Sequence, residues 1–449
     1  MTGEARGAAI PAPGAPVTTD VAPRRRAPLV ALFLAQFCSL SGNAIALVAI
    51  PIIALQQTGS PLAAGAAGVF ATLPLVIGGA FGGVLVDRFG YRTSSIAADV
   101  ASCATVLAIP LLHATGSLPF GALLALVFLG GLLDPPGDTA KTVLMPRLAD
   151  VARTPLTRAA GTQSAVQRTA SMIGAGTAGA LVALAGPMPA LIVDAAGFAL
   201  SAALVLVLVP RRVASTAVDA DAEPGAESGG TRAGFVAGIR FIARAPLLRA
   251  IVLLVTLTNA IDAAGMTVLK PVYATEVLGD PSLLGFMVGC FAAGALTGSV
   301  LFGAIGHRWS GRVMFATCFV LAGAPPYTAM ALGAEPPVLL PVLVLSGLAA
   351  GAINPMIATA MYALVPDGMK ARVFGAMTAG VAATMPVGAL AGGLAVEHFG
   401  ITATLATCAG LYLVIAGSPL LLRSFAGLSA VRPAATGTDD ARTAGDLSG

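Results

Sequence analysis

The sequence predicts an all-α integral membrane protein with twelve transmembrane helices in two pseudo-symmetric six-helix bundles, and three observations lead to this fold class. First, hydrophobic residues make up 57% of the chain and charged residues only 10%, with a mean hydropathy of +0.89, whereas soluble domains are roughly 25% charged. Second, the stretch from Ala27 to Val86 has no charged side chain, which is room for two spans of about 20 residues each. Third, the two halves of the chain repeat each other.

Turn signals divide the apolar sequence into spans. The first two spans are separated at QQTGSP, where Gly59 and Pro61 break the helical pattern. The same rule, applied along the chain, gives expected spans at 28–56, 62–86, 94–113, 118–145, 160–184, 188–209, 247–277, 283–306, 313–333, 337–364, 371–396 and 401–422.

The distribution of Lys and Arg predicts the orientation in the membrane. These residues gather in the two tails and in the loops after spans two, four, six, eight and ten, and only Lys141, Arg168 and Lys270 fall within or at the edge of spans. Basic loops stay in the cytoplasm. We therefore expect both termini to be cytoplasmic in a bacterial cell membrane, with the first span retained as a membrane anchor because it is too long for a signal peptide.

The expected domain organisation has two bundles joined by a polar linker. The linker segment VASTAVDADAEPGAESGG is acidic, rich in small residues and free of aromatics, which is typical of disorder. The expected parts are a disordered cytoplasmic tail (1–27), an N-terminal bundle (28–209), a largely disordered cytoplasmic linker (210–246), a C-terminal bundle (247–425) and a second disordered cytoplasmic tail (426–449).

The halves match without a gap when the sequence is shifted by 220 residues. The coincident pairs include Pro51 with Pro271, Gly59 with Gly279, Pro61 with Pro281, Gly65 with Gly285, Arg88 with Arg308 and Arg92 with Arg312. Parallel repeats of this kind are found in one large class of secondary transporters.

The loop after the second span carries a motif, GGVLVDRFGYR, with Gly83, Asp87, Arg88, Gly90 and Arg92. A second copy, GAIGHRWSGR, has Gly303, Arg308 and Arg312, with His307 in place of the aspartate. This motif resembles the loop between spans two and three of the major facilitator superfamily. The resemblance implies that these residues form a gating loop, which clamps the two halves in the outward-facing state.

A narrower resemblance involves the segments QFCSLSGNAIALVAIPIIALQQTGSPLAAG and LLDPPGDTAKTVLMPRLAD. They are similar to segments of twelve-span drug exporters that include macrolide-efflux proteins and a siderophore exporter. The resemblance implies export of a small molecule, with protons as the coupling ion. The segment GAGTAG matches a dinucleotide-binding pattern, but no strand precedes it, so we interpret its glycines as a helix-packing face.

Ionisable residues inside the spans are costly and mark candidate functional positions. Asp134 lies in the fourth span before Pro135, and its repeat partner is Asn354. Asp138 and Lys141 follow Asp134 at helical spacing, and with Arg168 they are expected to form an intramembrane ion network that joins spans four and five.

Further candidates lie in the first and seventh spans. Asp262 lies beside Asn259 in the seventh span, and we take Asp134 and Asp262 as the candidate carboxyl groups for proton coupling. Asn43 and Gln36 in the first span are candidates for lining a cavity or for a hydrogen bond between helices. The remaining charges in the spans, Asp99, Asp194 and Lys270, are interpreted as architectural or interfacial.

The function that this pattern favours is proton-coupled efflux of drugs or hydrophobic natural products by alternating access. Few charges, 18 Phe and 13 Met suit an apolar, adaptable cavity. The alternatives are export of one endogenous metallophore or metabolite, and a membrane scaffold or receptor that transports nothing. No enzymatic activity, cofactor, metal site or nucleic-acid partner is expected, and the chain is expected to act as a monomer in the lipid bilayer.

Overall fold

The structure is a computed structural model that describes residues 25–211, 230–305, 311–366 and 369–425; at some helical positions, among them 78–88 and 168, only the backbone is described. The N-terminal half consists of α1 (Ala27–Thr58), α2 (Pro61–Phe89), α3 (Tyr91–Ala114), α4 (Phe120–Val151), α5 (Leu156–Ala185) and α6 (Pro187–Leu208). The C-terminal half consists of α8 (Gly230–Arg244), α9 (Pro246–Ala264), η1 (Gly265–Leu269), α10 (Lys270–Val272), η2 (Tyr273–Val277), α11 (Leu283–Ile305), α12 (Arg312–Ala331), α13 (Pro336–Leu364), α14 (Lys370–Phe399) and α15 (Ile401–Leu421).

The described residues form twelve helical spans, six in each half, when α9, η1, α10 and η2 are taken as one continuous span. Ten of these spans are apolar and long enough to cross a bilayer, and α2 and α5 complete the set. Helices suit this setting because they satisfy every backbone hydrogen bond internally. The predicted fold class is confirmed, and most observed boundaries lie within a few residues of the expected ones.

The seventh span is locally unwound around a proline. Pro271 has no N–H to donate to the carbonyl group four residues earlier, and its ring crowds that carbonyl. The π-helical segments η1 and η2 flank the short α10 that contains Pro271. Such wide turns occur often at functional sites, and η1 begins three residues after Asp262.

The turns between the first two spans of each half have the same geometry. Gly59 has φ 67° and ends α1 by donating its N–H to the carbonyl of Leu55, and Gly279, its repeat partner, has φ 72°. Glycine populates this left-handed region without steric cost. The predicted break at QQTGSP is thus a glycine-capped turn, and it is repeated 220 residues later.

Part of the linker is helical, which differs from the expectation for 210–246. Residues 212–229 lie outside the described residues, but α8 occupies Gly230–Arg244 and packs on α14, where Gly238 contacts the backbone of Arg372. Apolar residues recur along α8 at helical spacing, as in Val236, Ile239 and Ile242, and this amphipathic pattern explains a helix on the surface of the bundle.

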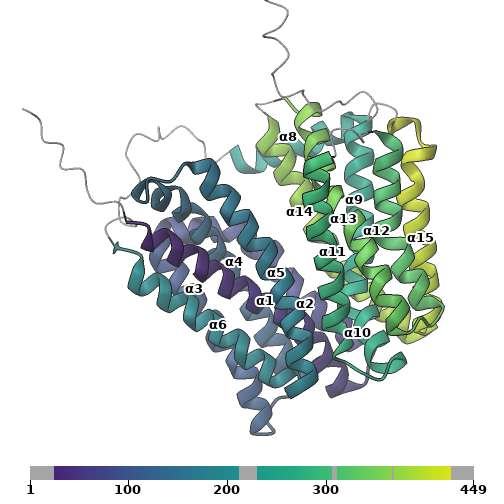
Figure 1. The fold of residues 1–449 in the computed structure, drawn as a ribbon, viewed down its shortest axis with the longest axis horizontal. Coiled ribbons are helices and arrows are strands. Elements are labelled where there is room, and N and C mark those ends of the chain that lie inside the picture. The colour runs from purple at the N-terminus through teal and green to yellow at the C-terminus, as the bar shows by residue number, and fades with distance from the viewer. Residues whose placement is uncertain (1–24, 212–229, 306–310, 367–368, 426–449) are drawn as a thin grey trace, which may run out of the picture.

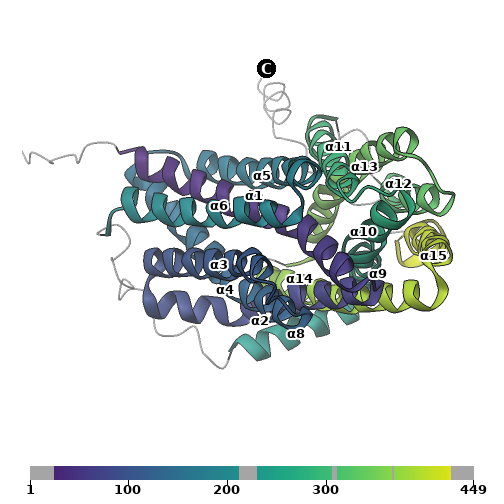
Figure 2. The ribbon, with the colours of Figure 1, turned by 90° about the horizontal axis from the view of Figure 1, so that it is seen from below.

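The two bundles approach each other at one end of the molecule. Figure 1 shows them meeting near α2, α5, α10 and α11 and diverging toward the end where α8 lies. We call the first the far end and the second the linker end. Figure 2 shows α1, α5 and α6 on one side of the N-terminal bundle and α2, α3 and α4 on the other.

Glycines form the closest approaches between the bundles. Gly65 on α2 contacts Gly393 on α14, and Gly285 on α11 contacts Gly179 on α5; a Cβ atom on Gly285 would overlap the backbone of Gly179. Gly65 and Gly285 are repeat partners. The far end is therefore closed by two equivalent glycine contacts, where small residues let helix backbones approach.

Candidate functional site

A cavity of about 510 Å³ lies inside the N-terminal bundle. Most of its wall is apolar, from α1 to α6, and Thr267, Val288 and Ala292 of the C-terminal half close one side. Its polar lining residues are Asn43, Thr72, Ser102, Asp134, Asp138, Ser171, Asp194 and Thr267. An apolar cavity with a few polar groups is the usual form of a small-molecule site.

Asp134 lines this cavity and is held by a residue of the first helix. The side-chain amide of Asn43 on α1 donates a hydrogen bond of 2.8 Å from Nδ2 to Oδ2 of Asp134 on α4. Both side chains are partly buried. Asp134 precedes the prolines 135 and 136 of α4. The structure thus brings together two of the predicted site residues, from spans that are far apart in sequence.

Lys141 forms a different ion pair from the one expected within the network of Asp138, Lys141 and Arg168. Its Nζ lies 2.8 Å from Oδ1 of Asp99 on α3 and donates to Oγ of Ser39 on α1 at 3.0 Å. Lys141 is 0% exposed, and a buried cation needs a fully paired carboxylate. Asp99 faces the ammonium group directly, so helical spacing on α4 alone did not identify the partner.

Asp99 also joins the sixth span to this network. Ser201 on α6 donates a hydrogen bond of 2.7 Å to Oδ2 of Asp99. Both carboxylate oxygens of Asp99 are therefore occupied, one by Lys141 and one by Ser201. The network connects α1, α3, α4 and α6 in the interior of the N-terminal bundle, and it is an architectural unit beside the cavity.

Asp138, another member of the expected network, forms no ion pair with Lys141 among the described residues. Asp138 lines the cavity, and its Oδ1 is buried with no hydrogen-bond partner among the described residues. The side chain of Arg168 lies outside the described residues. A contact of Arg168, on span five, with the charged residues of span four remains a prediction.

Gln36 makes a contact between helices instead of lining the cavity. It is buried on α1, and Nε2 of Gln163 on α5 donates to its Oε1 at 3.3 Å. This is one of the two roles expected for Gln36. The glutamine pair links the first and fifth spans.

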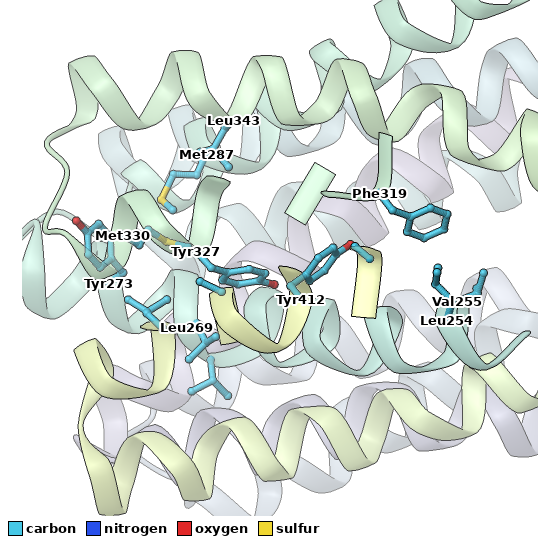
Figure 3. Packing of buried hydrophobic residues seen from close by; sticks show 14 of the residues in the cluster. Leu254, Val255, Leu269, Tyr273, Met287, Phe319, Tyr327, Met330, Leu343 and Tyr412 are labelled. Carbon is cyan, nitrogen blue, oxygen red and sulfur yellow. The ribbon is translucent and has the colours of Figure 1, made fainter. Parts of the chain in front are cut away.

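The C-terminal bundle holds a second polar cluster around Asp262. Tyr327 on α12 and Tyr412 on α15 each donate a hydroxyl hydrogen bond of 3.3 Å to this carboxylate, at Oδ1 and Oδ2 respectively. Figure 3 shows both tyrosines in the core of this bundle, and their ring centroids are 6.0 Å apart. Asp262 itself is exposed. The Tyr327 hydroxyl also lies 3.2 Å from the carbonyl of Ile261, so its proton is shared between the two acceptors. This carboxylate therefore combines two hydroxyl partners with an exposed position.

The residues predicted beside Asp262 have separate environments. The amide of Asn259 donates to the carbonyl of Val255 in its own helix at 2.8 Å, and Asn354 on α13 is exposed. Lys270 lies with its ammonium group 5.5 Å from the centroid of the Phe291 ring, a cation–π geometry. Tyr327 and Tyr412 were not identified as site residues from the sequence. The chain has only five tyrosines, so a tyrosine within an apolar span was a signal that could have pointed to them.

The described part of the loop motif holds helix ends within each bundle. Gly90 has φ 81° and precedes α3. Arg92 donates from Nε to the carbonyl of Val209 at 2.8 Å and also to that of Leu206, whereas Arg312 donates to the carbonyl of Leu420 at 2.6 Å. Each arginine thus caps the sixth span of its own half, where cations are favourable.

The rest of the motif is described only in part. Gly83 lies on α2 and Gly303 on α11, but the side chains of Asp87 and Arg88, like residue Arg308, lie outside the described part. A clamp between the halves remains a prediction for these residues.

Comparisons of the sequence show its family. The model of the Major Facilitator Superfamily matches residues 32–279 and 252–444. The multidrug efflux pump Tap of Mycolicibacterium fortuitum is 28% identical over 383 residues, which cover 85% of this chain and 92% of that protein. Tap of Mycobacterium tuberculosis is 27% identical over 389 residues, 84% of this chain and 89% of that protein.

Solved structures share the fold at low sequence identity. The nucleoside transporter NupG has a TM-score of 0.70 at 14% identity and covers 88% of this chain and 98% of its own. A bacterial homologue of the iron transporter ferroportin in the inward-facing state has a TM-score of 0.64 at 14% identity, with 87% and 98% coverage. With the family model matching both halves of a twelve-span protein, the chain belongs to the major facilitator superfamily.

Proposed function

We propose that this protein exports drugs or hydrophobic natural products in exchange for protons, by alternating access. The relatives named multidrug efflux pump Tap support export of drugs. The apolar cavity with its carboxyl groups supports a binding site for amphipathic small molecules. The single observation that carries the proposal is Asp134, a carboxyl group on the wall of that cavity.

The linker end is the cytoplasmic side in this proposal. The basic helix α8, with Arg240 and Arg244, lies at this end, and basic segments next to the membrane remain in the cytoplasm. The glycine contacts then close the outer side, between α2 and α14 and between α5 and α11. In this proposal the bundles are therefore closed toward the outside and diverge toward the cytoplasm, which is an inward-facing arrangement.

Asp134 and Asp262 divide the coupling between the two bundles. Asp134 is held by a neutral amide from α1, and Asp262 by two tyrosine hydroxyls. Neither carboxylate has a direct ion pair among the described residues, so each can take up a proton without breaking a salt bridge. A proton bound on one side of the membrane is released on the other side after the bundles rock.

The cavity also offers polar atoms for a ligand. Two residues that line the cavity, Asp138 and Ser102, each have a buried side-chain oxygen. These atoms, Oδ1 of Asp138 and Oγ of Ser102, have no hydrogen-bond partner among the described residues. Unpaired buried polar groups are costly. A substrate amine, hydroxyl or amide, or ordered water in its absence, satisfies these atoms.

Accumulation of a fluorescent dye in everted membrane vesicles tests this function. Vesicles receive an imposed proton gradient, and ethidium and a panel of amphipathic drugs serve as probes. Intact protein is expected to accumulate at least one probe, whereas Asp134→Asn and Asp262→Asn lose gradient-driven accumulation. Asp150→Asn, at an exposed carboxylate of α4, is the matched control and should behave like the intact protein.

Two outcomes would replace this proposal. If neither substitution affects uptake, residues other than Asp134 and Asp262 carry the proton coupling. Absence of uptake for every probe, with the protein folded, would favour a single endogenous metallophore or metabolite, or a scaffold that transports nothing.

A further inference from the structure

Asp194 occupies an unusual position at the wall of the cavity. It lies on α6, lines the cavity of the N-terminal bundle and is 0% exposed. Neither of its carboxyl oxygens has a hydrogen-bond partner among the described residues. It differs in this from Asp99 and Asp134, which are both held by named donors.

The first helix presses directly on this carboxyl group. Gly42 on α1 faces Asp194, and a Cβ atom built on Gly42 would overlap Oδ1. One turn further along α6, Gly197 packs on the backbone carbonyl of Cys38 in the same way. The close packing of α1 on α6 therefore keeps water away from the carboxyl group, since no larger residue and no solvent fits between them.

Among the described residues, no cation pairs with Asp194. Asp134 on α4 and Cys103 on α3 interact with it electrostatically, and neither is a cation. Lys141, the buried ammonium group of α4, is engaged by Asp99. On α1 the facing residue is Gly42, and the side chain of Arg168 on α5 lies outside the described part.

A bare carboxylate is unfavourable in this environment. Without water, a donor or a counter-ion, a buried negative charge lacks the interactions that normally stabilise it. The neutral acid avoids that cost and fits the apolar packing. Among the described residues, the packing of α1 on Asp194 therefore favours the protonated form.

We propose that Asp194 is a further proton-carrying residue of the N-terminal bundle, which rests on the proton-coupled function proposed above. It holds a proton while Gly42 covers it. When α1 and α6 separate at this point, water reaches the carboxyl group and the O–H bond breaks, which leaves a carboxylate and transfers the proton to water. The reverse step reloads it before α1 closes again.

Infrared spectroscopy of the purified full-length protein tests the protonation directly. A protonated carboxylic acid has a carbonyl stretching band at higher frequency than a carboxylate, and the band shifts in D₂O. At neutral pH, intact protein and the control Asp150→Asn are expected to show such a band, and Asp194→Asn to show a weaker one, because the other candidate acids remain. A band of unchanged intensity in Asp194→Asn would overturn the proposal. An intact spectrum without any protonated-acid band would overturn the proposal.

Transport by Asp194→Asn separates coupling from structure. Counterflow, the exchange of labelled for unlabelled ethidium without a gradient, should continue, whereas accumulation driven by a proton gradient should be lost. Gradient-driven accumulation equal to that of intact protein would overturn the proposal and leave the coupled function standing. If intact protein shows no gradient-driven accumulation, the proposed function fails, and the infrared result still decides the protonation state.

A second variant covers the case in which Asp194→Asn does not fold. The triple variant Asp134→Asn, Asp138→Asn, Asp262→Asn removes the other candidate acids and keeps Asp194. A protonated-acid band that persists in this variant supports the proposal, and its disappearance overturns it.

Discussion

Lys141 on α4 and Asp99 on α3 form a buried ion pair, with Nζ and Oδ1 2.8 Å apart and both side chains 1% exposed. The pair ties together the helices that surround the cavity. Removing one partner leaves the other charge buried and unpaired, which costs about 3–5 kcal/mol. Loss of one partner alone should therefore destabilise the N-terminal bundle.

Single substitutions at this pair should destabilise the protein more than the double substitution. Lys141→Met or Asp99→Asn is expected to lower the free energy of unfolding by about 3–5 kcal/mol, whereas the double variant should recover part of that loss. Thermal unfolding in detergent measures the effect. Additive losses in the double variant would show that the two side chains do not interact.

Arg92 and Arg312 should contribute equally to their own bundles. Each donates to the last carbonyl groups of the sixth span of its half, so Arg92→Ala and Arg312→Ala should each cost about 1.5–3 kcal/mol, the range for hydrogen bonds of charged groups. Arg240→Ala, at an exposed position on α8, should leave the melting temperature unchanged. A loss confined to one of the two arginines would contradict the equivalence of the bundles.

Closure at the far end should depend on glycine at the crossing of α5 and α11. Gly179→Leu places a side chain against the backbone of Gly285, so it should keep the bundles apart and abolish transport in folded protein. Gly161→Leu lies on the same helix, where a Cβ atom meets no neighbour, and should transport normally. Distances between spin labels placed on the two bundles at the far end measure how far apart the bundles lie. An unchanged distance in Gly179→Leu would contradict the role of this glycine contact in closing the far end.

The tyrosines around Asp262 should modulate the coupling step. Tyr327→Phe and Tyr412→Phe each remove one donor to the carboxylate, worth about 1.5–3 kcal/mol to a charged acceptor. Each variant should shift the pH at which gradient-driven uptake is half-maximal, with the pair shifting it further. An unchanged pH profile in the double variant would exclude Asp262 from the coupling.

The fold could be predicted because its determinants are local. The uncharged stretch from Ala27 to Val86, the breaks at Gly59 and Pro61 and the repeat of both 220 residues later follow from residue types alone. The helix α8 was not predicted, because the acidic segment before it dominated the composition of the linker.

The site was predictable only in part, because its contacts join distant spans. Charges within the spans identified Asp134, Asp262 and Lys141 as candidates. Their partners, Asn43, Tyr412 and Asp99, lie on other helices. Identifying these partners requires knowing which sides of the helices pack together. Helical spacing on α4 suggested Asp138 as the partner of Lys141. The closer carboxylate came from α3, which no spacing rule within one helix can indicate.

Proton movement during drug transport is the most direct test of coupled efflux. Purified protein is reconstituted into lipid vesicles that contain a pH-sensitive dye, with no other protein present, and a drug gradient is imposed without a pH gradient. The account predicts that drug flux through intact protein drives protons in the opposite direction, and that Asp134→Asn does not. Drug flux through intact protein with no change in internal pH would contradict it.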